Sequence, residues 1–377
     1  MRVEPRIPEA ALTPIREALA KAGAERVDAP ILQPLGLLLD LAGEAMRARL
    51  FVVQAEGGSE YCLRPDFTVA VARQHLERGA AAGRYAYEGR AFRASTGDRP
   101  EEFLQLGVEL FDRGAAETPA ADGEIAALAW RAAEAGGRKD LTLWLGDVGL
   151  FAPFIEALDL PDALAARLKR VAGRPRLFQA ELARAGGPAA NDEGSTLAAL
   201  LAGRPEAEAA AMLEEVWALA GVEPVGGRGA AEIAARLVRK AEAAAAPALT
   251  QAQAAALGEF MAISDTPDAA LARIGGLVSG RAAAGLKAAL KAWATRLKVL
   301  TQDVHGDRLR FAPALGHAFD YYDGLTFEVR SEALGADRPV ASGGRYDGLL
   351  ARLGGSADAR AVGCVVRPWR AWAGGEA

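Results

Sequence analysis

The stretch "EEFLQLGVELFD", residues 101–112, decides the fold. Side chains alternate across a strand, so one face of this segment carries leucine and valine while the other carries Gln105, Gly107 and Glu109. The apolar face predicts a core. The polar face is either a solvated sheet surface or a pair of acceptors suited to an amino group or a protonated ring nitrogen. Gly107 leaves bare backbone between the two acceptors, which the solvated alternative does not explain.

Strand and turn signals surround this segment. The run at 83–95 predicts its antiparallel partner, joined to it by the polar loop "STGDRP". The run at 49–65 predicts a hairpin that feeds a helix ending at Gly79. Strand patterns return in short runs after Leu300. Antiparallel strands in both flanks, with helices between them, indicate an α+β fold rather than a doubly wound α/β fold.

The chain changes character in its middle. Residues 151–299 are rich in Ala, Leu, Arg and Glu, have helical periodicity and lack Cys and His. We therefore expect a helical insertion domain there and a discontinuous first domain formed by residues 1–150 and 300–377. That first domain should begin with an amphipathic helix from Pro8 to Gly23.

Composition excludes several classes of protein. The 377 residues are 51% hydrophobic and 25% charged, which is ordinary for a globular protein. The net charge of −5, without a cationic run, argues against nucleic acid as a partner. Prolines and acids stand in residues 1–15, where a signal peptide needs an apolar segment, and no stretch suits a membrane span. We expect a cytoplasmic protein that binds no membrane.

The cysteines and histidines show no pattern typical of a reactive site. Cys62 and Cys364 each lie in a predicted strand without a CxxC companion, so both are expected to be reduced core thiols. His75, His305 and His317 have neither metal-ligand spacing nor a visible Ser or Cys partner. We expect no metal site, no catalytic triad and no cofactor.

Other polar and aromatic residues lie at the ends of predicted elements. In "LRPDFT", Asp66 and Thr68 stand where a strand passes into a helix, and Asp66 taken alone is better explained as a cap than as a cation ligand. The stretch "GGRYDG", residues 343–348, is most simply a turn, although glycines also let another group approach the backbone. Tyr321 and Tyr322 begin a predicted strand, so one should face the core and the other a ligand.

Taken in order, these segments resemble the motifs of class II aminoacyl-tRNA synthetases, and within that class those of histidyl-tRNA synthetase. The matching segments are "APILQP", "LRPDFT", "FRAS", "EEFLQLGVELF", "FDYYDGLTFEV", "SGGRYDGLLARLGG" and "AVGCVVRPWR". The resemblance covers about residues 1–150 and 300–373 and includes histidine-pocket motifs beside class-wide ones. It implies an antiparallel sheet flanked by helices, and a homodimer formed through the region around Pro30.

The resemblance also implies a histidine-binding pocket. Asp66 and Thr68 would bind the α-amino end of the ligand beside the acceptor pair of residues 101–112, with Gly107 as the pocket floor. Two tyrosines would frame the imidazole, and a glycine pair would form the wall. The complete implied set is Asp66, Thr68, Arg93, Gln105, Gly107, Glu109, Tyr322, Gly343, Gly344 and Tyr346.

Departures from the synthetase pattern point away from catalysis. His317 stands where the synthetase has an arginine at the carboxylate being adenylated, and histidine reproduces neither the reach nor the permanent charge of arginine. Arg93 of the ATP-binding motif is kept, but Ser95 occupies the position of an acid, and Arg370 lies in the unusual context "RPWR". Because the chain ends at Ala377, we expect no anticodon-binding domain.

A synthetase-like core with a kept histidine pocket and a spoiled adenylation site is similar to the regulatory subunits of ATP phosphoribosyltransferase. That resemblance implies no catalytic residue of its own, a short-form catalytic subunit as partner, and a homodimer within a hetero-oligomer. It also implies that histidine inhibits the first step of its own biosynthesis. An active or truncated synthetase-like enzyme that activates an amino acid is the alternative, supported by Arg93 and Arg370. A stand-alone amino-acid-binding protein is a third interpretation.

Overall fold

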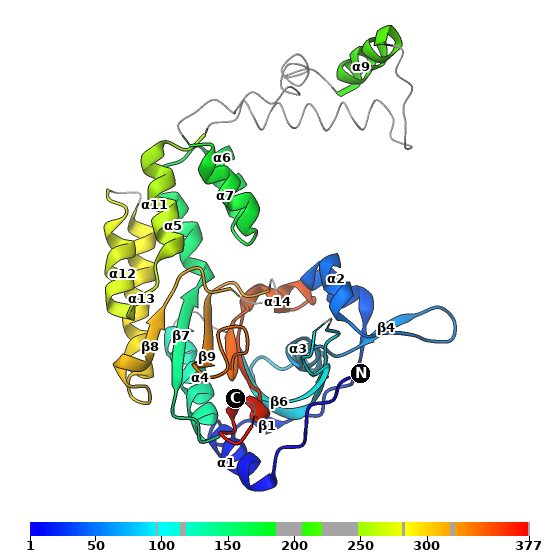
Figure 1. The fold of residues 1–377 in the computed structure, drawn as a ribbon, viewed down its shortest axis with the longest axis vertical. Coiled ribbons are helices and arrows are strands. Elements are labelled where there is room, and N and C mark those ends of the chain that lie inside the picture. The colour runs from blue at the N-terminus through cyan, green and yellow to red at the C-terminus, as the bar shows by residue number, and fades with distance from the viewer. Residues whose placement is uncertain are drawn as a thin grey trace. The chain divides into compact units, whose positions relative to one another are not determined.

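The core of the molecule is an eight-stranded sheet in the order β1-β5-β6-β11-β10-β9-β7-β8 (Figure 1). A computed structural model describes residues 1–95, 97–113, 118–185, 206–220, 248–280, 283–316 and 321–375. The strands from β5 to β7 in this order pair with one another in antiparallel fashion. The edge strands β1 and β8 pair in parallel with β5 and β7, respectively. The strands are β1 (Glu25–Arg26), β5 (Gly83–Phe92), β6 (Glu102–Arg113), β7 (Leu141–Asp147), β8 (Leu309–Phe311), β9 (Leu325–Ser331), β10 (Ala341–Arg345) and β11 (Ala359–Val366). The predicted α+β fold is confirmed.

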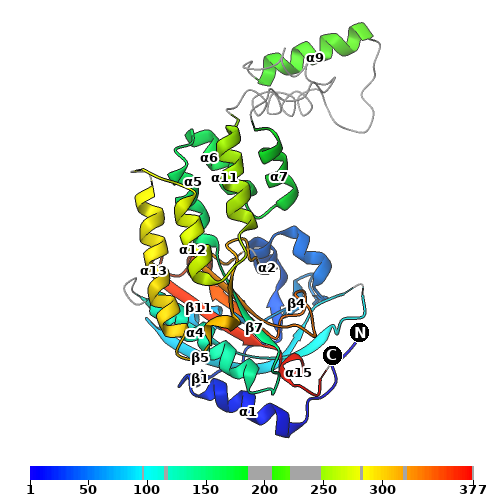
Figure 2. The same ribbon diagram turned by 60° about the vertical axis from the view of Figure 1, so that its left-hand side comes forward.

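Helices cover both faces of this sheet. On one face α4 packs against β9, β10 and β11 and against α13, whereas α3 and α14 contact β6 and β11 from the other (Figures 1 and 2). The helices and 3-10 turns are α1 (Glu9–Ala20), α2 (Leu35–Ala42), η1 (Glu44–Arg49), α3 (Thr68–Glu77), α4 (Thr118–Glu134), η2 (Val148–Leu150), α5 (Phe151–Ala157), α12 (Pro267–Gly276), α13 (Ala284–Leu300), η4 (Gly306–Arg308), α14 (Asp347–Arg352) and α15 (Pro368–Ala371).

Strand β6 is buried on both faces, because helices lie on each side of the sheet. Gln105 and Glu109 are 2% and 1% exposed, so the solvated alternative for the polar face is wrong. On the opposite face Leu106 and Val108 are buried, as the alternation predicted. Two polar side chains in a buried layer need partners, which makes this face the place to look for a site.

A smaller three-stranded sheet in the order β2-β4-β3 lies near the N-terminus. Its strands are β2 (Leu32–Pro34), β3 (Val52–Gln54) and β4 (Glu60–Leu63), and the antiparallel pairing of β3 with β4 confirms the predicted hairpin. Leu32 is paired with Leu63, and Val53 with Tyr61, so these four apolar side chains share one face of the sheet. Leu32 is 48% exposed and Val53 36%, so this apolar face is partly uncovered.

Local signals predicted the helix ends and the cysteines correctly. Helix α1 buries Leu12, Ile15 and Leu19, the stripe expected from its periodicity. The glycines that follow α1 and α3, Gly23 and Gly79, adopt a φ of +63°, a left-handed conformation that favours glycine. The two cysteines are buried free thiols, and burial raises the pKa of each.

The described chain divides into two compact units. Residues 1–157 and 259–377 form one, and residues 158–258 form the other, which contains α6 (Asp162–Val171), α7 (Pro175–Ala183), α9 (Glu206–Ala220) and the greater part of α11 (Gln251–Ala262). The domain boundaries expected at 150 and 300 remain predictions. Among the described helices, none has the length and apolar character needed to cross a membrane.

Candidate functional site

A cavity of about 280 Å³ lies on the face of the sheet that carries Glu109. Its walls come from segments far apart in the sequence: the start of α3, strand β5, the segment before β9, and the chain around α15. Acids and tyrosines share this lining with several arginines. The lining residues that matter for the chemistry are Asp66, Thr68, Tyr87, Arg93, Tyr322 and Arg370.

Glu109 lies beneath the cavity as the acceptor of several hydroxyl groups. Thr68 Oγ1 donates to Glu109 Oε1 at 2.8 Å, and the hydroxyl of Tyr87 lies 3.4 Å from the same oxygen. The hydroxyl of Tyr346 donates to Oε2. Burial raises the pKa of Glu109 to about 8, and the charge of Asp66 adds to this, while the three hydroxyl contacts oppose it. A cation arriving at this carboxyl would favour its ionised form.

Asp66 does not cap α3, contrary to the prediction from its local sequence. The N-cap residue is Phe67, and no side-chain hydrogen bond caps the helix. Both carboxylate oxygens of Asp66 are buried and make no well-formed hydrogen bond among the described residues, although the backbone amides of Thr68 and Val69 approach them. Gln105 Oε1 is buried without a hydrogen-bond partner among the same residues. Burial raises the pKa of Asp66, and the nearby charge of Arg93 and the backbone amides of Thr68 and Val69 oppose this shift. Unsatisfied buried acceptors beside a cavity are what a ligand with N–H donors requires.

The prediction that Tyr321 and Tyr322 begin a strand is wrong. Tyr321 and Tyr322 precede β9 instead of lying in it, so they do not alternate across the sheet. Both line the cavity, with ring centroids 4.9 Å apart. Their rings lie 5.9 Å and 6.2 Å from the ring of Tyr346 and make edge contacts with it. Three aromatic rings thus meet beside the buried acids.

Glycines allow this close packing. A Cβ atom on Gly107 would lie 2.2 Å from the hydroxyl of Tyr87 and 2.4 Å from the carbonyl oxygen of Cys364. One on Gly344 would lie 2.7 Å from the ring of Tyr322. Gly363, directly opposite Glu109 in the sheet, leaves room for its carboxylate, since a Cβ there would overlap Oε2. The backbone at these positions touches the site residues, as the glycine pattern suggested.

Arginines also line the cavity and supply positive charge. Arg93 donates from Nε to the carbonyl oxygen of Pro65 at 2.8 Å, and Arg370 donates to the carbonyl oxygen of Pro339 at 3.0 Å. Burial lowers the pKa of Arg370, and the charge of Arg367 lowers it further. Acids and arginines around one small cavity present complementary charges to a zwitterion.

The implied histidine-binding residues are largely brought together. Asp66, Thr68, Arg93 and Tyr322 line the cavity, while Glu109 and Tyr346 are in direct contact beneath it. Gly343 lies in β10, where a Cβ would meet the Gly363 carbonyl oxygen at 2.2 Å. His317 lies outside the described residues. The backbone carbonyl of Ser95 accepts a hydrogen bond from Arg2, and Ser95 does not line the cavity.

Sequence reasoning missed several residues of the site, and three of them are informative. They are Tyr87, Gly363 and Arg367. The alternation in "RYAYEGR" puts Tyr87 on the same face as Tyr85, but it does not show that this face meets Glu109. Arg367 pairs with Glu4 at 2.9 Å across 363 residues of sequence, a contact that no local pattern encodes.

Comparison with known proteins found similar sequences over nearly the whole chain. The chain matches the model of the histidyl-tRNA synthetase family over residues 6–225 and 225–368. It is 36% identical over 356 residues to the ATP phosphoribosyltransferase regulatory subunit of Brucella anthropi, covering 93% of each chain, and 36% identical over 347 residues to that of Brucella canis, covering 90% of each.

Solved structures share the fold. One from Bacillus halodurans, described as an ATP phosphoribosyltransferase regulatory subunit/histidyl-tRNA synthetase, gives a TM-score of 0.65 at 23% identity and covers 98% of this chain and 80% of its own. The histidyl-tRNA synthetase from Nostoc gives 0.59 at 16% identity, covering 98% and 74%. At these identities the likeness establishes the architecture, which is that of the class II synthetase core.

Proposed function

Because this chain belongs to the family of ATP phosphoribosyltransferase regulatory subunits, we propose that it is a non-catalytic subunit that binds histidine and conveys feedback inhibition. Its partner is the short-form catalytic subunit, which joins ATP to phosphoribosyl pyrophosphate. The cavity beside Asp66 and Glu109 is the histidine site. The observation that supports this best is the buried carboxylate of Asp66, which lines the cavity without a well-formed hydrogen bond, together with the unpartnered Gln105 Oε1.

Each part of the cavity suits a part of free histidine. The α-ammonium carries donors that satisfy Asp66, and a charge-assisted contact of this kind is stronger than a neutral one. The α-carboxylate faces Arg93, which lines the same cavity. The imidazole packs against Tyr322, which lines the cavity and is supported from behind by the ring of Tyr346, 6.2 Å away between centroids. No group of three metal-ligating side chains occurs among the described residues, and the proposal needs no cofactor.

The three-stranded sheet is the proposed dimer interface. Its open face carries Leu32, Val53, Tyr61 and Leu63, and Ile31 beside it is 49% exposed. A contiguous apolar face on an otherwise charged surface favours association. A second copy of the chain is the occupant that the class II resemblance of "APILQP" implies. Such a dimer would then assemble with catalytic subunits.

An amino-acid-activating enzyme is the second candidate. Arg93 and Arg370 line the same cavity, which is where activation of a carboxylate would need positive charge. Against this stands His317 in place of an arginine in the synthetase pattern. Loss of that fixed cation favours binding over chemistry.

Calorimetric titration with histidine and two of its analogues tests the binding mode. Imidazole propionate lacks the ammonium and so leaves Asp66 unsatisfied, whereas histamine lacks the carboxylate that faces Arg93. We expect both analogues to bind at least about 10-fold more weakly than histidine, because each loses a charge-assisted contact. Equal binding of imidazole propionate and histidine would contradict the role of Asp66. Co-purification with the short-form catalytic subunit tests the partnership separately.

A further inference from the structure

A chain of buried ion pairs runs along the face of the sheet opposite the histidine site. Asp122, on α4, is fully buried and accepts from Arg296 Nε of α13 at 2.8 Å and from Arg345 Nε of β10 at 2.7 Å. A further nitrogen of Arg345 lies 2.6 Å from the same carboxylate. Arg345 also pairs with Asp347 at 2.8 Å. One carboxylate therefore joins two helices and a central strand.

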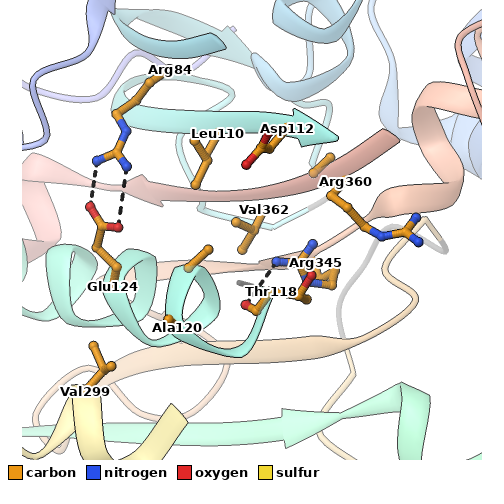
Figure 3. Close-up of a pocket in the computed structure, with 12 residues that line it drawn as sticks. Arg84, Leu110, Asp112, Thr118, Ala120, Glu124, Val299, Arg345, Arg360 and Val362 are labelled. Carbon is orange, nitrogen blue, oxygen red and sulfur yellow. Dashed lines mark hydrogen bonds and ion pairs between the residues drawn. The ribbon is translucent and has the colours of Figure 1, made fainter. Parts of the chain in front are cut away.

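Arg345 lines a second cavity, separate from the proposed histidine site. Figure 3 shows Arg345 reaching from its strand toward the beginning of α4, where it contacts the backbone of Thr118. The cavity on this face, about 490 Å³, also contains the pair of Arg84 with Glu124 at 2.6 Å. Its floor is apolar, with Leu110 immediately following Glu109 in β6. The same strands thus carry the histidine site on one face and this network on the other.

The backbone of Arg345 holds both Tyr322, against which the imidazole packs, and Tyr346, which supports it. Tyr346 is the next residue in the chain, and its hydroxyl contacts Glu109. The carbonyl oxygen of Arg345 accepts from the amide of Asp323 at 3.0 Å, which fixes the residue that follows Tyr322. The carboxylate of Asp323 in turn accepts from the amides of Asp347 and Gly348 at the beginning of α14. A shift of Arg345 would move both tyrosines.

We propose that Asp122 is a positioning residue for the histidine site: through its ion pair with Arg345 it fixes Tyr346 and Tyr322 from the far side of the sheet. This inference rests on the proposed histidine binding. Asp122 touches no part of the ligand cavity and acts only through the strand. Breaking one buried ion pair leaves Arg345 without its main counter-charge, so the strand end relaxes.

The test compares Asp122→Asn with Glu124→Gln, two neutralising substitutions of the same kind on one helix. Glu124 also pairs with an arginine, but its side chain is 45% exposed and its partner does not adjoin a pocket tyrosine. We expect Asp122→Asn to weaken histidine binding about 3- to 30-fold and Glu124→Gln to leave it unchanged. Thermal unfolding without histidine measures the separate effect on stability. If Asp122→Asn does not fold, Arg345→Lys replaces it, because lysine keeps the charge but loses the two-point guanidinium contact with Asp122 that positions the strand end.

A double-mutant cycle separates positioning from general destabilisation. In a Tyr346→Phe background the hydroxyl that reports the position of the strand end is absent, so Asp122→Asn should add less than its effect in the wild type. The pH profile of histidine binding should also move to higher pH in Asp122→Asn, because the hydrogen bond from Tyr346 lowers the pKa of Glu109.

The possible results have separate meanings. Wild-type affinity in Asp122→Asn, or effects of Asp122→Asn and Tyr346→Phe that multiply independently, would overturn the positioning role while histidine binding stands. The same holds if Arg345→Lys stands in for it. Absence of histidine binding to the wild-type protein would overturn the proposed function, and the positioning role with it.

Discussion

Replacing Glu109 with glutamine removes a titratable group from beneath the cavity while nearly preserving its shape. Burial raises the pKa of Glu109 to about 8, so in the ligand-free protein at neutral pH this carboxyl is mostly protonated. The charge of Asp66 contributes to that shift, which shows that a charge at Asp66 acts on Glu109. An ammonium group bound at Asp66 should therefore favour the ionised form of Glu109 and release its proton.

The magnitude follows from the size of the shift. One pH unit below its pKa the group is about nine-tenths protonated, and ionising it costs about 1.4 kcal/mol. The contribution of Glu109 to histidine affinity, measured against Glu109→Gln at each pH, should thus be roughly 10-fold smaller at pH 7 than above pH 8, with close to one proton released from Glu109 on binding near pH 7. The sign is fixed by the direction of the pKa change: a raised pKa that falls on binding makes the affinity rise with pH.

Calorimetry in two buffers with different heats of ionisation measures the released protons directly. Histidine has its own titrating groups, so the informative quantity is the difference between wild type and Glu109→Gln. We expect wild type to release close to one proton more than the variant near pH 7. The variant should also bind about 10-fold or more weakly at high pH, where the wild-type carboxylate is charged. Equal proton release by both proteins would refute the coupling of Glu109 to the ligand.

Three further predictions concern packing, assembly and chemistry. Gly107→Ala should lower the free energy of unfolding by about 1–3 kcal/mol and impair histidine binding, because its Cβ would overlap the hydroxyl of Tyr87. Denaturant unfolding checks this against Gly36→Ala, where a Cβ meets nothing within 4 Å; equal stability of the two variants would contradict it. Leu32→Asp should convert the dimer into monomers, as measured by light scattering at micromolar concentration. Leu177→Asp is the control and should not, since Leu177 is 47% exposed and Leu32 48%. A monomeric wild-type protein would refute the interface. Finally, no histidine-dependent exchange of pyrophosphate into ATP is expected, and exchange above a protein-free control would restore the synthetase-like alternative.

The regular elements could be predicted because their signals are local. The alternation in 101–112 identified β6 and the face that carries Glu109, and the glycines after α1 and α3 marked the helix ends. These patterns depend on residues a few positions apart, which is the range over which backbone geometry acts. The resemblance also implied that the strands before and after the helical middle share one sheet, and the strand order, in which β5 and β6 stand beside β11, β10 and β9, confirms that arrangement.

The errors and omissions concern contacts between distant segments. Tyr322 does not lie in β9, since Asp323 bonds to the chain around Arg345 and the strand starts only at Leu325. Asp66 is not the N-cap residue, because α3 begins after Phe67 and Asp66 lines the cavity, although the amides of Thr68 and Val69 lie near its carboxylate. Gly363 was missed because its importance comes from standing opposite Glu109 in the sheet. Strand register is a tertiary property, and the sequence of one strand does not show which residue of a distant strand lies opposite each of its positions.

Feedback inhibition of the reconstituted complex tests the central claim most directly. The short-form catalytic subunit would be assayed with the wild-type chain, with Glu109→Ala and with the matched surface variant Glu124→Gln, each normalised to its own rate without histidine. The account predicts that Glu109→Ala raises the histidine concentration for half-inhibition roughly 10-fold or more, while Glu124→Gln does not change it. An unchanged midpoint for Glu109→Ala would contradict the account and place the inhibitory site elsewhere.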